Sequence, residues 1–208
     1  MTTCYRMIST NNWKKYGTSK SHTCIQDEMQ QNIPVAGMCR DYMIPHFSFE
    51  KQFAVDIPER EHWLDDDYHP IPPSSHTVYT DGSGGVLGMG AGICFNGLTS
   101  DLYFPLGHYT SVFQAETHAI MQCALALKRL DPSDEHICIC SDSQAVLIAL
   151  CNPRVVSKQI WECIRALSEL ANHRPVNLTW VPAHSGIPDN EQANHLAKTA
   201  SCQPYIQL

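Results

Sequence analysis

Three carboxylates stand where an isolated acid would be destabilising, and their placement indicates a site for hard metal ions. Asp81 follows a short β-pattern at residues 77–80, Glu116 lies inside an apolar helical stretch, and Asp142 follows the apolar run at residues 136–140. A lone buried carboxylate is costly unless it is neutralised, paired or bound to a cation. Oxygen ligands from two strand ends and a helix suit Mg²⁺ or Mn²⁺ better than Zn²⁺.

Glu116 is the most informative of the three because of the helix that carries it. The apolar side of that helix is marked by Phe113, Ile120, Ala124 and Leu127. Glu116 falls on this core-facing side, and no Lys or Arg lies within one turn of it. Asp142 by itself is equally well explained as ordinary helix-start chemistry beside Ser143. It is therefore the combination of the three acids that predicts the metal site.

Four short motifs, in order along the chain, resemble those of the ribonuclease H family. They are Tyr79-Thr-Asp-Gly-Ser83, Gln114-Ala-Glu-Thr-His-Ala-Ile120, Ser141-Asp-Ser143 and Trp180-Val-Pro-Ala-His-Ser-Gly-Ile-Pro-Asp-Asn-Glu-Gln-Ala-Asn194. The resemblance covers roughly residues 75–202. It implies a ribonuclease H-like fold and cleavage of the RNA strand of RNA–DNA hybrids with two Mg²⁺ ions, for which Mn²⁺ can substitute. The products would carry 5′-phosphate and 3′-hydroxyl ends.

The resemblance also assigns roles to particular residues. Asp81, Glu116 and Asp142 would bind the metal ions and act in catalysis, and His184 would be the catalytic histidine of a loop that moves as a unit. The fourth acidic position of the family holds Asn194 in this sequence. An amide oxygen can still coordinate a hard cation, but it brings no charge. Asn194 is therefore expected to be a weaker metal ligand, with lower metal affinity or an altered pH dependence as the result.

Two further positions are expected to contact the substrate. The backbone of Gly82 and Ser83 follows Asp81 directly and would contact the 2′-hydroxyl groups that distinguish RNA from DNA. The glycines at this point permit a close approach of the ligand.

The details of the motifs are similar to the ribonuclease H domains of non-LTR retrotransposon reverse transcriptases. Val112 and Phe113 stand where cellular members tend to carry two amide side chains, and the stretch 151–157 is too short for an extra basic helix. A reverse transcriptase or another recruiting protein is thus an expected partner.

The pattern of secondary structure supports this fold independently of the motifs. Strand signals at residues 77–80, 91–95 and 99–104 include an Asn96-Gly97 hairpin turn, and helical and strand patterns then alternate to Trp180. We predict an α/β fold with a five-stranded mixed sheet, three antiparallel strands followed by parallel ones, and helices packed on it.

Composition restricts the setting of this domain. The net charge of −7 is unusual for a nucleic-acid-binding protein and predicts weak, salt-sensitive binding by this chain alone. Ten scattered cysteines and eleven histidines lack paired ligand spacing, so no zinc site is expected, and the thiols are expected to be reduced. No apolar run is long enough to span a bilayer. An intracellular location in nucleus or cytoplasm follows, with mitochondria the less favoured alternative.

The chain is expected to divide into three parts. Residues 1–75 form an N-terminal extension that ends in an acidic and proline-rich linker, in part disordered; residues 76–202 form the ribonuclease H domain; and residues 203–208 are a tail. The alternation at residues 47–57 is compatible with a strand or with a segment that packs on the catalytic domain.

Three functions stay open at this level. The first is an endoribonuclease that cuts the RNA of RNA–DNA hybrids. The second is a catalytically weakened or dead module that binds nucleic acid or a protein, which Asn194 would explain. The third is a DNA-directed nuclease of the same general fold, against which the motif Ala183-His-Ser-Gly186 argues.

Overall fold

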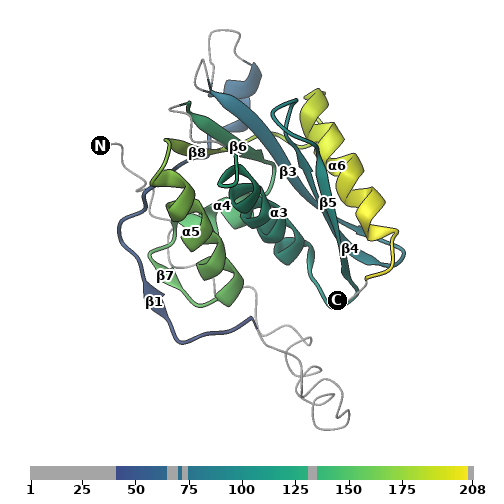
Figure 1. The fold of residues 1–208 in the computed structure, drawn as a ribbon, viewed down its shortest axis with the longest axis horizontal. Coiled ribbons are helices and arrows are strands. Elements are labelled where there is room, and N and C mark those ends of the chain that lie inside the picture. The colour runs from purple at the N-terminus through teal and green to yellow at the C-terminus, as the bar shows by residue number, and fades with distance from the viewer. Residues whose placement is uncertain (1–40, 65–69, 72–74, 131–134, 206–208) are drawn as a thin grey trace. The chain divides into compact units, whose positions relative to one another are not determined.

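The computed structural model describes residues 41–64, 70–71, 75–130 and 135–205, and the described residues from Tyr42 onward belong to one compact unit (Figure 1). Its strands are β1 (His46–Phe47), β2 (Ala54–Asp56), β3 (His76–Gly85), β4 (Gly88–Cys94), β5 (Leu102–Gly107), β6 (Ile137–Ser141), β7 (Arg154–Val155) and β8 (Val176–Trp180). Its helices are the 3-10 helix η2 (Arg60–Leu64) and the α-helices α3 (Val112–Leu127), α4 (Gln144–Cys151), α5 (Lys158–Ala171) and α6 (Pro188–Ser201).

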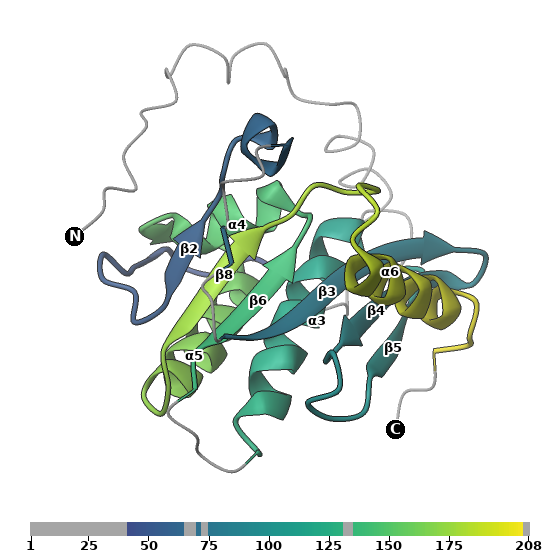
Figure 2. The same cartoon turned by 90° about the horizontal axis from the view of Figure 1, so that it is seen from above.

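One mixed sheet of six strands organises this unit. Its strand order is β2-β8-β6-β3-β4-β5, and Figure 2 shows the strands from above. The neighbours β2, β8, β6 and β3 are parallel, whereas β3, β4 and β5 are antiparallel. The α/β fold with antiparallel and then parallel strands is therefore confirmed. The strand count of five is wrong: β2 is a sixth strand beside β8, and a three-residue strand leaves too little alternation to be counted from sequence.

Helices cover the two faces of the sheet unequally. Figure 1 shows α3, α4 and α5 on one face and α6 on the other. Helix α6 lies unusually close to β4, because a Cβ atom added at Gly90 or Gly92 would come within 2.2 Å of a backbone oxygen of α6. Helix α3 begins at a capping box, in which Ser111 Oγ accepts from the Gln114 amide and the Gln114 side chain accepts from the Ser111 amide.

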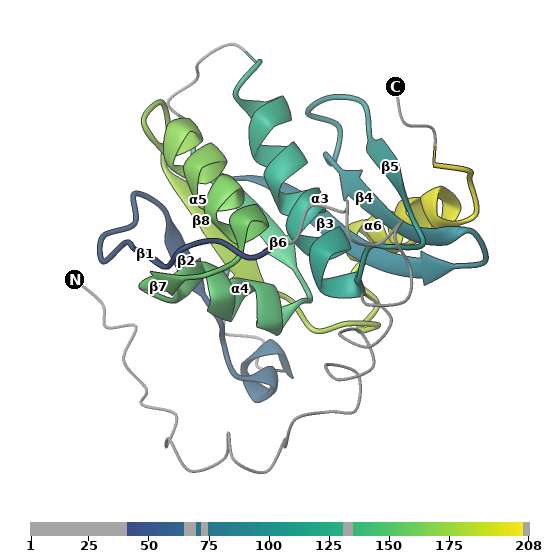
Figure 3. The same cartoon turned by 90° about the horizontal axis from the view of Figure 1, so that it is seen from below.

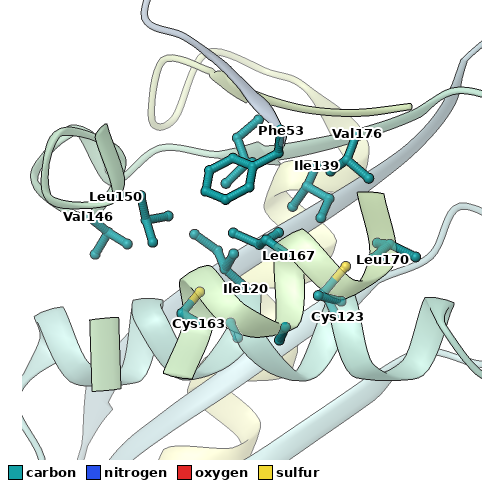
Figure 4. Close-up of a cluster of buried hydrophobic side chains, with 14 of the residues drawn as sticks. Phe53, Ile120, Cys123, Ile139, Val146, Leu150, Cys163, Leu167, Leu170 and Val176 are labelled. Carbon is teal, nitrogen blue, oxygen red and sulfur yellow. The ribbon is translucent and has the colours of Figure 1, made fainter. Parts of the chain in front are cut away.

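The segment before the sheet contributes to the main core. Phe53 is only 5% exposed, and Figure 4 shows it among Ile120 of α3, Ile139 of β6 and Leu167 of α5. Just before it, β1 pairs antiparallel with β7, as seen from below in Figure 3. Trp63 of η2 packs, partly buried, against the hydrophobic clusters on both faces of the sheet. The part of this segment from Phe53 to Trp63 therefore packs on the six-stranded sheet, as the alternation at residues 47–57 suggested.

Some expectations concern residues that lie outside the described part of the chain. These are residues 1–40 of the N-terminal extension, residues 65–69 and 72–74 of the linker, and residues 206–208 of the tail. The division at residues 75 and 202 stays a prediction. Within the described residues, none of the helices combines the length and apolar character that crossing a bilayer requires.

The position of Phe53 gives a direct test of this packing. Replacing Phe53 with Ala should lower the free energy of unfolding by about 3–5 kcal/mol, because it leaves a cavity in the core. The matched control is Phe49→Ala, since Phe49 is 80% exposed and its loss should change stability by no more than about 0.5 kcal/mol. Urea denaturation of both variants measures this difference; equal stability would show that residues 42–64 do not pack on the core.

Candidate metal centre

The strand register brings two of the three predicted acids together. The parallel pairing of β3 with β6 ends with Thr80 opposite Ser141, so the next residues are Asp81 on β3 and Asp142 directly after the end of β6. Asp81 does not end its strand as expected, because Gly82–Gly85 continue β3 by pairing with β4. Asp81 therefore lies where the parallel partner stops and the antiparallel partner continues.

Helix α3 supplies the third acid through a close contact with β3. A Cβ atom added at Gly82 would lie 2.4 Å from the backbone nitrogen of Glu116, so only glycine allows the helix to approach this far. Gly82 is buried under the helix and forms a backbone hydrogen bond with the Glu116 carboxylate. The contact of Gly82 and Ser83 with substrate stays a prediction, and Ser83 is the more accessible of the two.

The resulting cluster has the composition of a site for hard cations. One carboxylate oxygen each of Asp81, Glu116 and Asp142 lie within 4.8 Å of one another. Asp81 is 6% exposed and Glu116 is 5% exposed. Asp81 Oδ2 and Glu116 Oε2 are buried and have no hydrogen-bond partner in the part of the chain that the structure describes. Unpartnered buried carboxylate oxygens at this spacing fit divalent cations with oxygen ligands.

Electrostatics show the cost of this arrangement for the protein alone. Burial, and then repulsion by Asp142, raises the pKa of Asp81 to about 7. Burial and the charges of Asp81 and Asp142 raise the pKa of Glu116 well above its usual value. Burial also raises the pKa of Asp142. Without a cation, the cluster therefore favours bound protons near neutral pH.

Two contacts orient Asp142 from neighbouring elements. The Asn190 side chain donates a hydrogen bond to the Asp142 carboxylate, which opposes the rise in its pKa. The indole Nε1 of Trp180 donates to the Asp142 backbone oxygen at 3.0 Å. The end of β8 and the first turn of α6 thus fix this acid from two directions.

His184 lies on the loop between β8 and α6, beside the cluster. Its side chain is 71% exposed, and its Nδ1 is 3.5 Å from Glu191 Oε1 of α6. Its backbone is in the left-handed region, with φ of 51°. The charge of His184 also opposes the rise in the pKa of both Asp81 and Asp142. The structure therefore places His184 within electrostatic reach of the predicted metal ligands.

Asn194 is half-buried on α6, which packs against β3 and β4. Asn190, Asn194 and Lys198 are four residues apart, so they follow one face of the helix. Asn190 reaches Asp142, and the charge of Lys198 opposes the rise in the pKa of Asp81. Asn194 lies between these two on the face toward the cluster, and its role as a ligand stays a prediction.

Three contributors to the site were not predicted: Asn190, Glu191 and Lys198. Asn190 and Lys198 share the four-residue spacing of Asn194, and that spacing is present in the sequence. It becomes informative only when the helix is known to begin at Pro188 and to face β3 and β4. Glu191 of α6 contacts His184, which lies on a loop. A loop has no periodic sequence pattern, so this contact could not be predicted.

The fold and the carboxylate cluster together define an α/β protein with a centre suited to divalent cations. The RNase H family model matches residues 73–202, more than half of the chain. The chain therefore belongs to the RNase H family. Membership of this family supports a nuclease, that is, a hydrolase that binds nucleic acid. Divalent metal ions are typical of the family, and the carboxylate cluster is compatible with them.

The contact at Gly82 is testable by adding one methyl group. Gly82→Ala should lower the free energy of unfolding by about 1–3 kcal/mol, because the new Cβ atom would meet the backbone of α3. It should also weaken stabilisation by Mg²⁺, since α3 carries Glu116. Gly84→Ala is the control, because its Cβ atom would meet only the flexible Met89 side chain, at 3.3 Å. Thermal unfolding with and without Mg²⁺ measures both effects; identical behaviour of the two variants would contradict the close contact.

The raised pKa values predict how stability depends on pH. When a chelator keeps the site free of metal, Asp81 has its usual pKa of 3.8 in the unfolded state and a pKa of about 7 in the native state. Between these two pH values the native state therefore binds more protons than the unfolded state. The free energy of unfolding should therefore fall as pH rises through this window.

Added Mg²⁺ should reverse that fall, so its stabilising effect should be greater at pH 8 than at pH 5. Asp81→Asn should flatten the pH dependence, because it removes one of the repelling charges. Thermal unfolding across pH, with chelator or with Mg²⁺, measures this. A Mg²⁺ effect that is the same at both pH values would contradict cation binding by ionised carboxylates of this cluster.

Proposed function

We propose that this chain is an endoribonuclease that cuts the RNA strand of RNA–DNA hybrids, leaving 5′-phosphate and 3′-hydroxyl ends. The observation that supports it most is the triad of Asp81, Glu116 and Asp142, with carboxylate oxygens within 4.8 Å in a chain of the RNase H family. Asp81, Glu116, Asp142 and the amide of Asn194 would hold the metal ions. When bound, two Mg²⁺ ions would activate a water molecule and stabilise the departing 3′ oxygen, and Mn²⁺ would substitute.

The protein's own groups have distinct tasks in this proposal. The Asn190 side chain and the Trp180 indole hold Asp142 in place. Glu191 lies beside Nδ1 of His184, so a proton on Nδ1 is favoured and Nε2 is left to accept or deliver one. The imidazole is exposed on its loop, and in this proposal it would act on either the attacking water or the departing oxygen.

Recognition of the hybrid is proposed to occur next to the triad. Ser83 follows on β3 from Asp81, and Val112 lies at the first turn of α3, where it is partly exposed. Because the net charge is −7, we expect binding to be weak and salt-sensitive. A reverse transcriptase or another recruiting protein would supply additional affinity. We also propose that this chain is related to the ribonuclease H domains of non-LTR retrotransposons and that it acts inside the cell.

A second candidate function is a binding module with little or no activity. It is favoured by one observation: the uncharged Asn194 stands on the α6 face that is directed toward the cluster. With one fewer carboxylate, the site attracts divalent ions less strongly.

Cleavage of a labelled RNA–DNA hybrid, in low salt with Mg²⁺ or Mn²⁺, separates these two functions. The first predicts cutting confined to the RNA of the hybrid, with no cutting of matched RNA or DNA duplexes. Asp142→Asn should abolish the cutting, because it removes an ionised ligand while keeping the size of the side chain.

The result with the Asn194→Asp variant distinguishes a weakened site from a wrong one. A silent chain that becomes active with Asn194→Asp is the binding module with a decayed site. Cutting that persists unchanged in Asp142→Asn would show that the carboxylate cluster is not the active centre.

A further inference from the structure

A cavity lies outside the carboxylate cluster, between η2 and the loop that carries His184. Its volume is about 420 Å³, within the range of small-ligand sites. It is lined by Arg60, Glu61 and Trp63 of η2 and by Pro182, Ser185 and Ile187 of the loop. The first three precede the part of the chain that the RNase H family model matches, which begins at residue 73. One wall of the cavity is thus formed by residues outside the family match.

The sheet explains why this cavity is near the metal centre. Strands β2, β8 and β6 are parallel neighbours, so the segments that follow their carboxyl ends meet at one edge of the sheet. These segments are η2, the His184 loop and Asp142, in that order. Figure 2 shows η2 and the connection from β8 to α6 on the same side of the sheet. The cavity therefore lies at the same edge of the sheet as Asp142.

One hydrogen bond ties the start of the loop to β6, and another closes the loop on itself. The Val181 amide donates to the oxygen of Ser141, the residue before Asp142, at 3.1 Å, and the hydroxyl of Ser185 donates to the Pro182 oxygen at 2.8 Å. A ligand in the cavity would therefore contact the loop that presents His184.

The lining combines the groups that recognise a nucleotide. Trp63 is half-buried, and the part of its indole that lines the cavity can stack on a base; its Nε1 is buried and has no hydrogen-bond partner among the described residues. Glu61 can accept from an exocyclic amino group of a base, and Arg60 can bind a phosphate. Both charged side chains are exposed, as groups at the mouth of a cavity must be to meet a ligand from solvent.

We infer that this cavity binds an unpaired nucleotide of the RNA strand, next to the hybrid segment that is cut. Stacking on an aromatic side chain requires a base that has left the duplex, which makes the unpaired nucleotide the fitting ligand. The claim that the nucleotide belongs to the RNA strand being cut rests on the proposed function, whereas the claim that the cavity binds a nucleotide does not. A free ribonucleotide has the same chemistry, so the experiment separates the two sources.

Nucleotide binding can be followed in the full chain without any cleavage. The chain has four tryptophans, and Trp63→Phe assigns the indole N–H signal of Trp63 in a ¹⁵N–¹H NMR spectrum. In a chelator, this signal should shift on titration with adenosine monophosphate and with a hybrid that carries an unpaired RNA extension. Arg60→Ala should weaken binding of the extended hybrid about tenfold, whereas Arg154→Ala, an exposed arginine on β7, should not.

The cleavage assay then compares hybrids with blunt ends and with unpaired RNA extensions at either end. The wild-type chain should cut one extended hybrid about tenfold faster than the blunt one, and Arg60→Ala should reduce this ratio. A Trp63 signal that shifts in a chain without any cleavage would support the cavity while the proposed function failed. A signal that responds to adenosine monophosphate but not to the extended hybrid would assign the cavity to free nucleotides and overturn the inference, as would no response to either.

Discussion

Mutual repulsion of three buried carboxylates is the constraint on which the rest of this structure depends. Asp81, Glu116 and Asp142 destabilise the metal-free protein when all are ionised, so the fold must hold them together against that repulsion. The parallel register of β3 and β6 fixes the two aspartates at adjacent positions. The missing side chain of Gly82 lets α3 bring the glutamate to them. A bound divalent cation would offset this repulsion and stabilise the folded protein.

The sequence predicts the parts of the site that follow strong local patterns. A carboxylate on the apolar side of a helix, and aspartates that follow two apolar strand patterns, are visible without any structure, and the triad indeed converges. The extent of β3 is not visible in this way, because a glycine run weakens a strand signal and only pairing with β4 continues the strand. The contacts of Asn190 and Lys198 depend on which face of α6 meets the sheet, and that is decided by tertiary packing.

The segment before the family match has a larger part in the structure than its composition indicates. Phe53 inserts into the core between the sheet and helices α3 and α5, and β2 extends the sheet beyond β8. Only a few apolar residues produce this effect, so periodicity over a window of ten or more residues does not detect it. Because β2 is parallel to β8, the same segment brings η2 to the edge of the sheet where the metal centre lies. The pairing of β2 with β8 thus both anchors this segment to the sheet and places η2 as one wall of the cavity.

Charge balance at the centre determines how cations and substrate depend on one another. Asn194 contributes no charge, and Lys198 acts on Asp81 as a positive charge, so the protein provides a weaker field for divalent ions than four carboxylates would. Mg²⁺ in nucleotide-processing sites is commonly held by one or two carboxylates together with phosphate oxygens of the substrate. On the proposed function, the scissile phosphate would complete the coordination that the protein leaves short. Because such coupling is reciprocal, cation and hybrid would each raise the affinity for the other, and the neutral side chain at position 194 would make the site depend on its substrate.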